Sequence, residues 1–237
     1  MIIATNVTKK FGKLIALDSL NVSCNKGESI ALIGPNGSGK TTFIKCLLGM
    51  VVPDSGFITF NKHNIKHDWK YRSQIGYMPQ IGRFPDNMTI AQVVDMMKDI
   101  RKPFNKTFDD ELVTSFGLDK VMDKRMRTLS GGTRQKVGAS LAFMFNPDVL
   151  ILDEPTAGLD PVATEVLKEK IRKERLLGKL IMITSHVLSD LDEIISQVMY
   201  MQEGKLMFHK TFEQLKQDTG EVQLSKAIAS VMKAQII

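Results

Sequence analysis

The segment Gly34 to Thr41 constrains this chain more than any other feature of its sequence. It reads GPNGSGKT and matches the pattern G-x-x-x-x-G-K-[ST]. The apolar run Ser29 to Ile33 precedes it, and apolar residues follow it at helical spacing. Such a loop between a strand and a helix predicts phosphate binding, because its backbone N–H groups converge on the anion and the helix dipole attracts it. An ordinary glycine turn is the alternative, and chance matches are expected in on the order of one chain in a hundred.

Two acidic residues end a second apolar run. Leu150 to Leu152 is followed by Asp153 and Glu154, and phosphoryl transfer to water needs one carboxylate near Mg²⁺ and another near the attacking water. A third run, Leu180 to Ile183, is followed three residues later by His186. Ligands gather at the carboxyl ends of parallel strands, so we expect these side chains to converge on the glycine-rich loop. By itself, a strand ending in two acids indicates only a polar strand exit.

A second small-residue turn lies at Leu129 to Gly132, which reads LSGG. Apolar residues at helical spacing follow it, so this turn also precedes a helix N-terminus and predicts a second anion site. In isolation such a turn is a helix cap. In combination with the loop and the two acids, it indicates nucleotide binding.

The order of apolar runs predicts an α/β fold. We expect a P-loop NTPase core with a parallel sheet, an N-terminal antiparallel β subdomain in which Leu20, Val22 and Cys24 alternate with polar residues, and an inserted helical subdomain. Glu203-Gly204 within Val198 to Phe208 predicts a hairpin. The expected organisation is a single domain, 1–237, with its core at 1–86 and 147–220, helices at 87–146 and a C-terminal tail at 221–237.

Composition narrows the possible partners. The net charge of +6 is a modest excess. The basic residues of one predicted helix face alternate with acids, so we expect a solvated face and no nucleic-acid partner. These residues are Lys168, Arg172, Arg175 and Lys179, with Glu165, Glu169 and Glu174 between them. Two cysteines without metal-ligand spacing favour buried thiols in a reducing compartment. No apolar stretch approaches the roughly 18 residues of a membrane helix, so we expect any pore to come from another chain.

The motifs occur in the order found in ATP-binding cassette (ABC) ATPases, and nearly the whole chain resembles the nucleotide-binding domain of an ABC transporter. The segments that carry the resemblance are Gly34 to Thr41, Gln80, Leu129 to Gly132, Leu150 to Glu154, Ala157 to Asp160 and His186. The sequence departs from the family pattern at Phe11, where Tyr is more frequent, and at Thr133, where Gln is frequent. Base stacking tolerates the first change, and the serine and glycines of the turn remain at the second.

The resemblance implies ATP and Mg²⁺ as cofactors. The nucleotide-binding residues that it implies are Phe11, Gly34, Pro35, Asn36, Gly37, Ser38, Gly39, Lys40, Thr41, Thr42, Ser130, Gly131, Gly132 and Asp160. The implied metal-binding residues are Thr41, Gln80 and Asp153. The implied catalytic residues are Glu154 as general base, together with His186, Gln80 and Lys40.

The expected function is that of a subunit that binds and hydrolyses ATP to energise transport. The resemblance implies a homodimer in which each Ser130 turn completes the partner's ATP site. It also implies separate transmembrane permease subunits and a peripheral location on the cytoplasmic face of the cell membrane. Among transporters, the chain looks most like exporter-type cassettes, some of which serve copper-site maturation of nitrous oxide reductase.

Two other classes of function stay open at this point. A soluble ABC ATPase acting on ribosomes or DNA typically has paired cassettes, zinc modules or a coiled-coil insertion, for which the span from Lys40 to Ser130 has no room. A non-enzymatic ATP-binding protein is expected to lack the base, whereas Glu154 is present.

Overall fold

Two units make up the chain: Met1–Tyr71 together with Met182–Ile237, and Arg72–Ile181. The computed structural model describes residues 1–104 and 107–234. Two residues of the predicted helical subdomain and the last three of the predicted tail lie outside the described residues. The subdomain boundaries drawn from the sequence stay a prediction.

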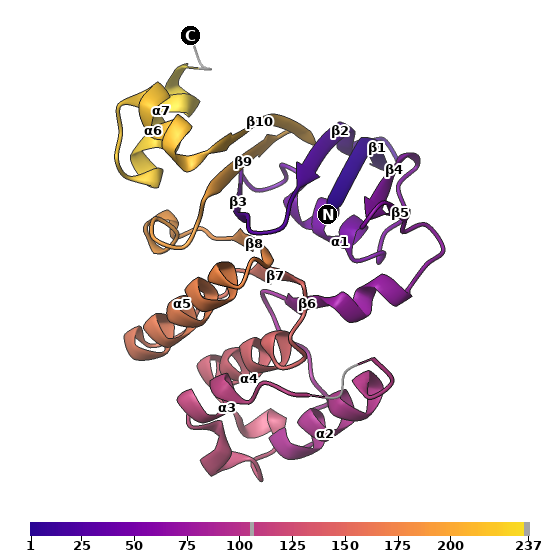
Figure 1. The fold of residues 1–237 in the computed structure, drawn as a ribbon, viewed down its shortest axis with the longest axis vertical. Helices are drawn as coiled ribbons and strands as arrows, with labels where there is room; N and C mark the ends of the chain where they lie inside the picture. The colour runs from indigo at the N-terminus through magenta and orange to yellow at the C-terminus, as the bar shows by residue number, and fades with distance from the viewer. Residues whose placement is uncertain (105–106, 235–237) are drawn as a thin grey trace. The chain divides into compact units, whose positions relative to one another are not determined.

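The first unit contains a four-stranded antiparallel sheet in the order β2-β1-β4-β5 (Figure 1). Its strands are β1 (Ile2–Phe11), β2 (Leu14–Cys24), β4 (Ser55–Phe60) and β5 (His63–Asn64). Along β2, Leu20, Val22 and Cys24 are buried and the residues between them are exposed. The alternation predicted from the sequence is confirmed, and one face of this sheet is apolar.

The loop between β3 and α1 follows a strand of the second sheet of this unit. β3 (Ser29–Ile33) is buried along its whole length and runs parallel to β9 (Gln197–Gln202), which pairs antiparallel with β10 (Lys205–Thr211). The strand order is β10-β9-β3-β8, with β8 at Leu180–Thr184, and α1 spans Lys40–Leu47. The predicted hairpin is confirmed: Glu203 and Gly204 form its turn with φ of 49° and 78°, the left-handed values that tight two-residue turns require.

The C-terminal segment forms two helices, α6 (Phe212–Thr219) and α7 (Leu224–Ala234), after the 3₁₀ helix Leu188–Asp190. Thr211 caps α6, and Gly220 ends it in the left-handed conformation. Leu224 and Ile228 are buried, and the Leu224 N–H donates to the Asp192 carboxylate at 3.0 Å. This part of the tail therefore packs against its own unit.

The second unit combines two parallel strands with four α-helices and with shorter 3₁₀ helices among its described residues. β6 (Ile75–Met78) pairs with β7 (Val149–Asp153), and β8 follows β7 in the strand order. The α-helices are α2 (Ile90–Arg101), α3 (Glu111–Ser115), α4 (Gly131–Phe143) and α5 (Pro161–Leu176), and the 3₁₀ helices are Lys70–Gln74, which begins in the first unit, Leu118–Val121 and Met126–Thr128.

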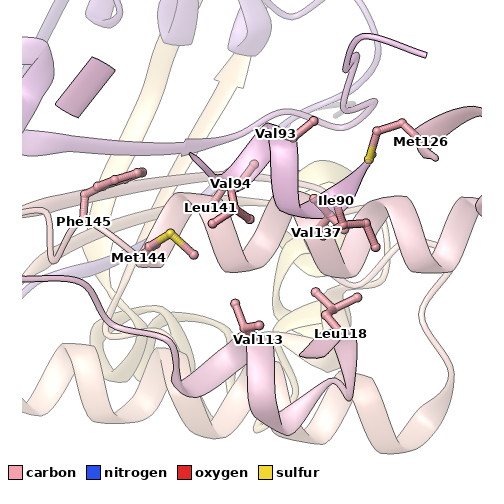
Figure 2. Packing of buried hydrophobic residues seen from close by; sticks show 10 residues of the cluster. All are labelled: Ile90, Val93, Val94, Val113, Leu118, Met126, Val137, Leu141, Met144 and Phe145. Atoms are coloured by element: carbon pink, nitrogen blue, oxygen red, sulfur yellow. The ribbon is translucent and has the colours of Figure 1, made fainter. Parts of the chain in front are cut away.

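Apolar side chains from α2, α3 and α4 share one core (Figure 2). Its buried members are Ile90, Val93, Val94, Val113, Leu118, Met126, Val137, Leu141, Met144 and Phe145. Thr89 starts α2 with a capping box completed by Gln92. Gly76 lets α4 approach β6 closely, because a Cβ there would lie 2.1 Å from the Ala142 carbonyl oxygen. α4 is therefore fixed to this core and to the strands of its unit.

The charged face of α5 is less solvated than the sequence predicts. Glu174 is only 3% exposed, and it pairs with Lys170 at 2.9 Å and with Lys179. Lys170 also binds Glu111 at 2.8 Å. Burial by itself would lower the pKa of Lys170, but the hydrogen bonds that its ammonium donates to Asp109, Glu111 and Glu174 raise that pKa above its ordinary value. The prediction of a solvated face is wrong at Glu174, whose buried carboxylate pairs with Lys170 and Lys179.

Both cysteine thiols are buried in the first unit. Burial, reinforced by the charge of Glu28, raises the pKa of Cys24 to about 12. The pKa of Cys46 is raised to about 11, mainly by burial of its thiol. The thiolate is the reactive form of cysteine, so both groups should be inert in the native state.

We expect the native protein to show no fast thiol labelling by a disulfide reagent at pH 8. With a pKa of about 11, roughly one thiol in a thousand is ionised at that pH. Both thiols should react within minutes after unfolding in guanidinium chloride. Cys24→Ser and Cys46→Ser would assign the signals, and rapid labelling of the folded protein would contradict the buried environment.

Candidate nucleotide-binding site

The loop after β3 is built around glycines that no other residue can replace. Gly34 has φ of 156°, and a Cβ there would lie 2.1 Å from the Met201 carbonyl oxygen. Gly39 has φ of 103°, and its Cβ would lie 2.5 Å from the Ala16 carbonyl oxygen. The backbone therefore makes a tight concave turn against β9 and β2, the form that brings N–H groups together around an anion.

Lys40 is held by the same loop. Its ammonium donates to the carbonyl oxygen of Gly34 at 2.7 Å and to that of Pro35 at 3.0 Å. The hydroxyl of Ser38, which is 2% exposed, lies 3.5 Å from it. The positive charge thus sits at the loop and is ready to meet an anion bound there.

The N-terminus of α1 supplies further donors. Its N-cap is Gly39, no side chain caps the helix, and its first turn has no acidic residue. Thr41 is exposed and Thr42 partly exposed in that turn. The first-turn N–H groups and these hydroxyls therefore suit phosphate oxygens.

The β9–β10 turn braces the loop, a contact that sequence reasoning missed. The Gly204 N–H donates to the Ser38 carbonyl at 3.0 Å, and the Asp18 N–H donates to the Gly204 carbonyl at 2.9 Å. A loop, a hairpin and β2 are thus joined by backbone hydrogen bonds. In the sequence, only the glycine at position 204 indicates such a close contact. In the structure, a Cβ at Gly204 would lie 3.0 Å from the Ala16 carbonyl oxygen.

Two other predicted residues belong to the same unit. Phe11 ends β1 with 49% of its surface exposed, and the Lys9 ammonium lies 5.4 Å from its ring centroid. An exposed ring of this kind can stack on a base. His186 follows β8 and is also exposed.

In the second unit, the carboxyl ends of β6 and β7 meet at one edge. Met78 pairs with Leu152 in parallel register, so Gln80 and Asp153 both leave the sheet at that edge. Asp153 is partly exposed and Gln80 is exposed. Glu154 has φ of 53°, a conformation that costs a residue with a side chain about 1–3 kcal/mol and persists only where neighbours hold it.

The first turns of α4 contact the loop 154–160 at three places. A Cβ at Gly132 would lie 2.7 Å from the Gly158 carbonyl oxygen. The Gln135 amide donates to the Glu154 carbonyl at 3.1 Å, and the Lys136 ammonium donates to the Asp160 carboxylate at 2.8 Å. The small-residue turn and the segment after the two acids therefore form one packed element.

Capping side chains define both ends of this element. Ser130 is the N-cap of α4, and its hydroxyl accepts from the Thr133 N–H at 3.2 Å. Asp160 is the N-cap of α5 and accepts from the Ala163 N–H at 2.9 Å. The hydrogen bonds from Lys136 and from the Ala163 N–H lower the pKa of Asp160. The helix-cap interpretation of Ser130 is thus correct.

The predicted residues fall into two groups. Phe11, the loop 34–42 and His186 lie in the first unit, and Gln80, the turn 130–132, Asp153, Glu154 and Asp160 lie in the second. Sequence reasoning missed Gln135 and Lys136, because one polar and one basic residue in a helix carry no distinguishing local signal.

The oxygen donors at the carboxyl ends of β6 and β7 suit Mg²⁺ chemically. Within the described ranges 1–104 and 107–234, no three or more His, Cys, Asp or Glu side chains are grouped as metal ligands. Mg²⁺ rarely needs such a cage, since it is commonly held by one or two carboxylates together with substrate phosphates and water. Gln80 and Asp153, at the carboxyl ends of β6 and β7, carry oxygen donors of that kind.

In the part of the chain that the structure describes, no helix has the length and apolar character needed to cross a membrane.

Comparison with known proteins gives the family context. The family model described as ABC transporter matches residues 17–157. The bacitracin transport ATP-binding protein BcrA of Bacillus licheniformis is 33% identical over 90% of this chain and 70% of its own length. The lantibiotic transport ATP-binding protein SrtF of Streptococcus pyogenes is 32% identical over 88% of this chain and 90% of its own. The Nod factor export ATP-binding protein I of Ralstonia nicotianae is 30% identical over 83% of this chain, which spans 63% of that relative's length.

Solved structures share the fold. An ATP-binding subunit of an ABC transporter superposes with a TM-score of 0.88 at 23% identity, covering 98% of this chain and 99% of that one. The dimeric bacterial ABC transporter cassette MJ0796 gives a TM-score of 0.78 at 21% identity, covering 89% of this chain and 98% of that one. These likenesses confirm the predicted α/β fold.

The close approach of Gly132 to Gly158 predicts opposite effects of two neighbouring substitutions. Gly132→Ala should destabilise the protein by about 1–3 kcal/mol, because its methyl group would meet a backbone oxygen. Gly131→Ala, which has nothing within 4 Å of its Cβ, should be neutral or stabilise the helix by about 0.5–1 kcal/mol. Urea unfolding of the two variants measures both effects, and equal stabilities would refute the packed element.

Proposed function

This chain belongs to the ABC transporter family, whose members hydrolyse ATP to power transport, and we propose that it is the ATP-binding and ATP-hydrolysing subunit that energises an exporter. The single observation that carries the proposal is the loop 34–41, whose Gly34 and Gly39 lie where a Cβ would meet a backbone carbonyl and whose Lys40 ammonium is held by the loop. Its membrane-spanning subunits would be separate chains.

The loop would bind the nucleotide through several of its own groups. Backbone N–H groups of the loop would bind the phosphates. They would come from Gly34, Asn36, Gly37, Ser38 and Gly39, whereas Pro35 has no N–H and would only shape the loop. Lys40 would neutralise the β and γ phosphates, and Thr41 and Thr42 would contribute hydroxyls. Phe11 would stack on the adenine ring. These contacts would hold the nucleotide and fix its orientation.

The edge of β6 and β7 would supply the hydrolytic chemistry. Asp153 and Gln80, with Thr41, would hold Mg²⁺, which when bound supplies charge neutralisation for the phosphates. Glu154 would accept the proton of the attacking water, and His186 would orient the γ phosphate. The shared edge of the two parallel strands supports the pairing of Gln80 with Asp153.

The small-residue turn would act on a second copy of the chain. Ser130, Gly131 and Gly132 lie at the start of α4, where the N–H groups of the helix would bind an anion, while the chain has one P-loop. In a two-fold pair, each turn would complete the partner's ATP site, with Asp160 in the loop that joins the two sites. The dimeric form of the similar cassette MJ0796 supports this arrangement.

The names of the relatives support export as the direction of transport. Relatives named for bacitracin transport, lantibiotic transport and Nod factor export support a role in export from the cytoplasmic face of the membrane. The narrower prediction of copper-site maturation of nitrous oxide reductase has no support among these relatives. Copurification with a membrane protein encoded nearby tests the partner.

We expect Lys40→Ala to weaken Mg·ATP binding strongly or to abolish hydrolysis, because no other group of the loop offers a mobile positive charge to the γ phosphate. Fluorescent-nucleotide titration and phosphate release measure the two effects. Lys45→Ala on the exposed side of the same helix is the control and should behave like the parent. Unchanged affinity and turnover in Lys40→Ala would exclude this loop as the nucleotide site.

We expect Glu154→Gln to bind Mg·ATP normally but to hydrolyse it about 10² to 10⁴ times more slowly, a loss of roughly 3 to 5 kcal/mol of transition-state stabilisation. Gln keeps the shape of the side chain and loses its basicity, so an ATP-bound dimer should accumulate. Single-turnover hydrolysis and size-exclusion chromatography with Mg·ATP measure both.

Adding Ser130→Arg to this variant should abolish the dimer while a monomer still binds nucleotide. A hydrolysis rate near that of the parent in Glu154→Gln would place the base elsewhere. A dimer that survives Ser130→Arg would contradict the composite sites.

A further inference from the structure

The backbone of Glu154 is in a conformation that needs support from outside its own segment. Its φ of 53° lies in the left-handed region, where a side chain is unfavourable in the absence of compensating contacts. The direction of its side chain depends on that backbone angle, because a relaxed φ would swing the Cβ away from the edge of β7. Whatever holds the peptide of Glu154 therefore sets the position of its carboxylate.

A buried amide from another helix holds that peptide. Gln135 is 8% exposed, and its Nε2 donates to the Glu154 carbonyl at 3.1 Å and approaches the Pro155 carbonyl at 3.5 Å. The Ala157 N–H donates to the same Glu154 oxygen at 3.1 Å. Burying an amide is costly unless the amide is hydrogen-bonded. The carbonyl groups of Glu154 and Pro155 supply the hydrogen bonds that the buried Gln135 amide needs.

The same helix is fixed to the far end of the loop. Lys136, the next residue of α4, binds the Asp160 carboxylate at 2.8 Å, and Gly132 packs against the backbone of Gly158. The helix turn that begins with Ser130 therefore contacts the loop 154–160 at its beginning, middle and end. A displacement of that turn would be passed to the Glu154 peptide through Gln135.

We infer that Gln135 is a positioning residue for Glu154: its buried amide holds the strained Glu154 backbone and so links the Ser130 turn to the carboxylate that activates water. This inference rests on the proposed function, because it requires Glu154 to act as the base. Gln135 itself touches neither nucleotide nor water in this role. It acts only through the orientation of its neighbour.

Gln135→Met tests the inference, since Met matches the length of Gln but donates no hydrogen bond. We expect the single-turnover rate of ATP hydrolysis at saturating Mg·ATP to fall about 10- to 100-fold, the size of effect that a small misplacement of a catalytic group produces. The nucleotide affinity of the monomer should stay unchanged. Gln135→Leu provides a second variant if Met fails to fold, which thermal unfolding reveals.

Ser140→Ala is the matched control. Ser140 lies on the same helix, is 2% exposed and donates a hydrogen bond within α4, to the Lys136 carbonyl at 2.9 Å. Removing the Ser140 hydroxyl deletes this hydrogen bond but no contact with the loop 154–160. Hydrolysis by this variant should match that of the parent even if its stability falls.

The deciding measurement adds Gln135→Met to Glu154→Gln. If Gln135 acts through the Glu154 carboxylate, the second change should lower the residual hydrolysis by less than about twofold, because residues that act as a unit are not additive. An equal loss in both backgrounds, or a normal rate in Gln135→Met itself, overturns the inference. A normal rate in Glu154→Gln instead refutes the base assignment of the proposed function, so the two failures are distinguishable.

Discussion

Both units of this chain depend on places where two backbone segments lie so close together that no side chain fits between them. In the first unit, Gly34 and Gly39 allow the loop 34–41 to lie against the carbonyl groups of β9 and β2. In the second, Gly76 lets α4 reach β6, and Gly132 lets the start of α4 reach the loop after β7. At each contact a methyl group would meet a carbonyl oxygen well inside van der Waals distance, so the geometry depends on the glycine.

These contacts explain why the proposed chemistry is located in loops on rigid supports. A loop must expose its N–H groups to bind phosphate, which costs it the hydrogen bonds of regular structure. The chain compensates with hydrogen bonds from neighbouring turns, such as the Gly204 N–H to the Ser38 carbonyl at 3.0 Å. The loop 154–160 receives the same kind of support from Gln135 and Lys136. Both loops are thus preorganised by groups that lie outside the motifs.

Sequence reasoning succeeded where the signal is local and failed where it is not. The run Ser29–Ile33 coincides with β3, and the Glu203-Gly204 turn with the hairpin, because apolar runs and turn residues act over a few positions. The motifs gave the family for the same reason. Gln135 contacts a residue 19 positions away, and Lys170 binds Glu111 across 59 positions. No periodicity in the sequence encodes such pairs. The hydrogen bond that supports Glu154 and the buried charges of α5 are therefore visible only in the structure.

Ser130 illustrates why a structural and a functional interpretation of one residue need not exclude each other. Its hydroxyl accepts the Thr133 N–H and shares a 2.9 Å hydrogen bond with the Thr133 hydroxyl. A hydroxyl has one proton to donate and two lone pairs to accept with. If the Thr133 hydroxyl is the donor, both acceptor sites of Ser130 are used within the turn and its proton remains for an incoming anion. Thr133, the departure from the family pattern, would then orient that proton, so the cap that starts α4 would also prepare the turn for the phosphate that we propose it binds.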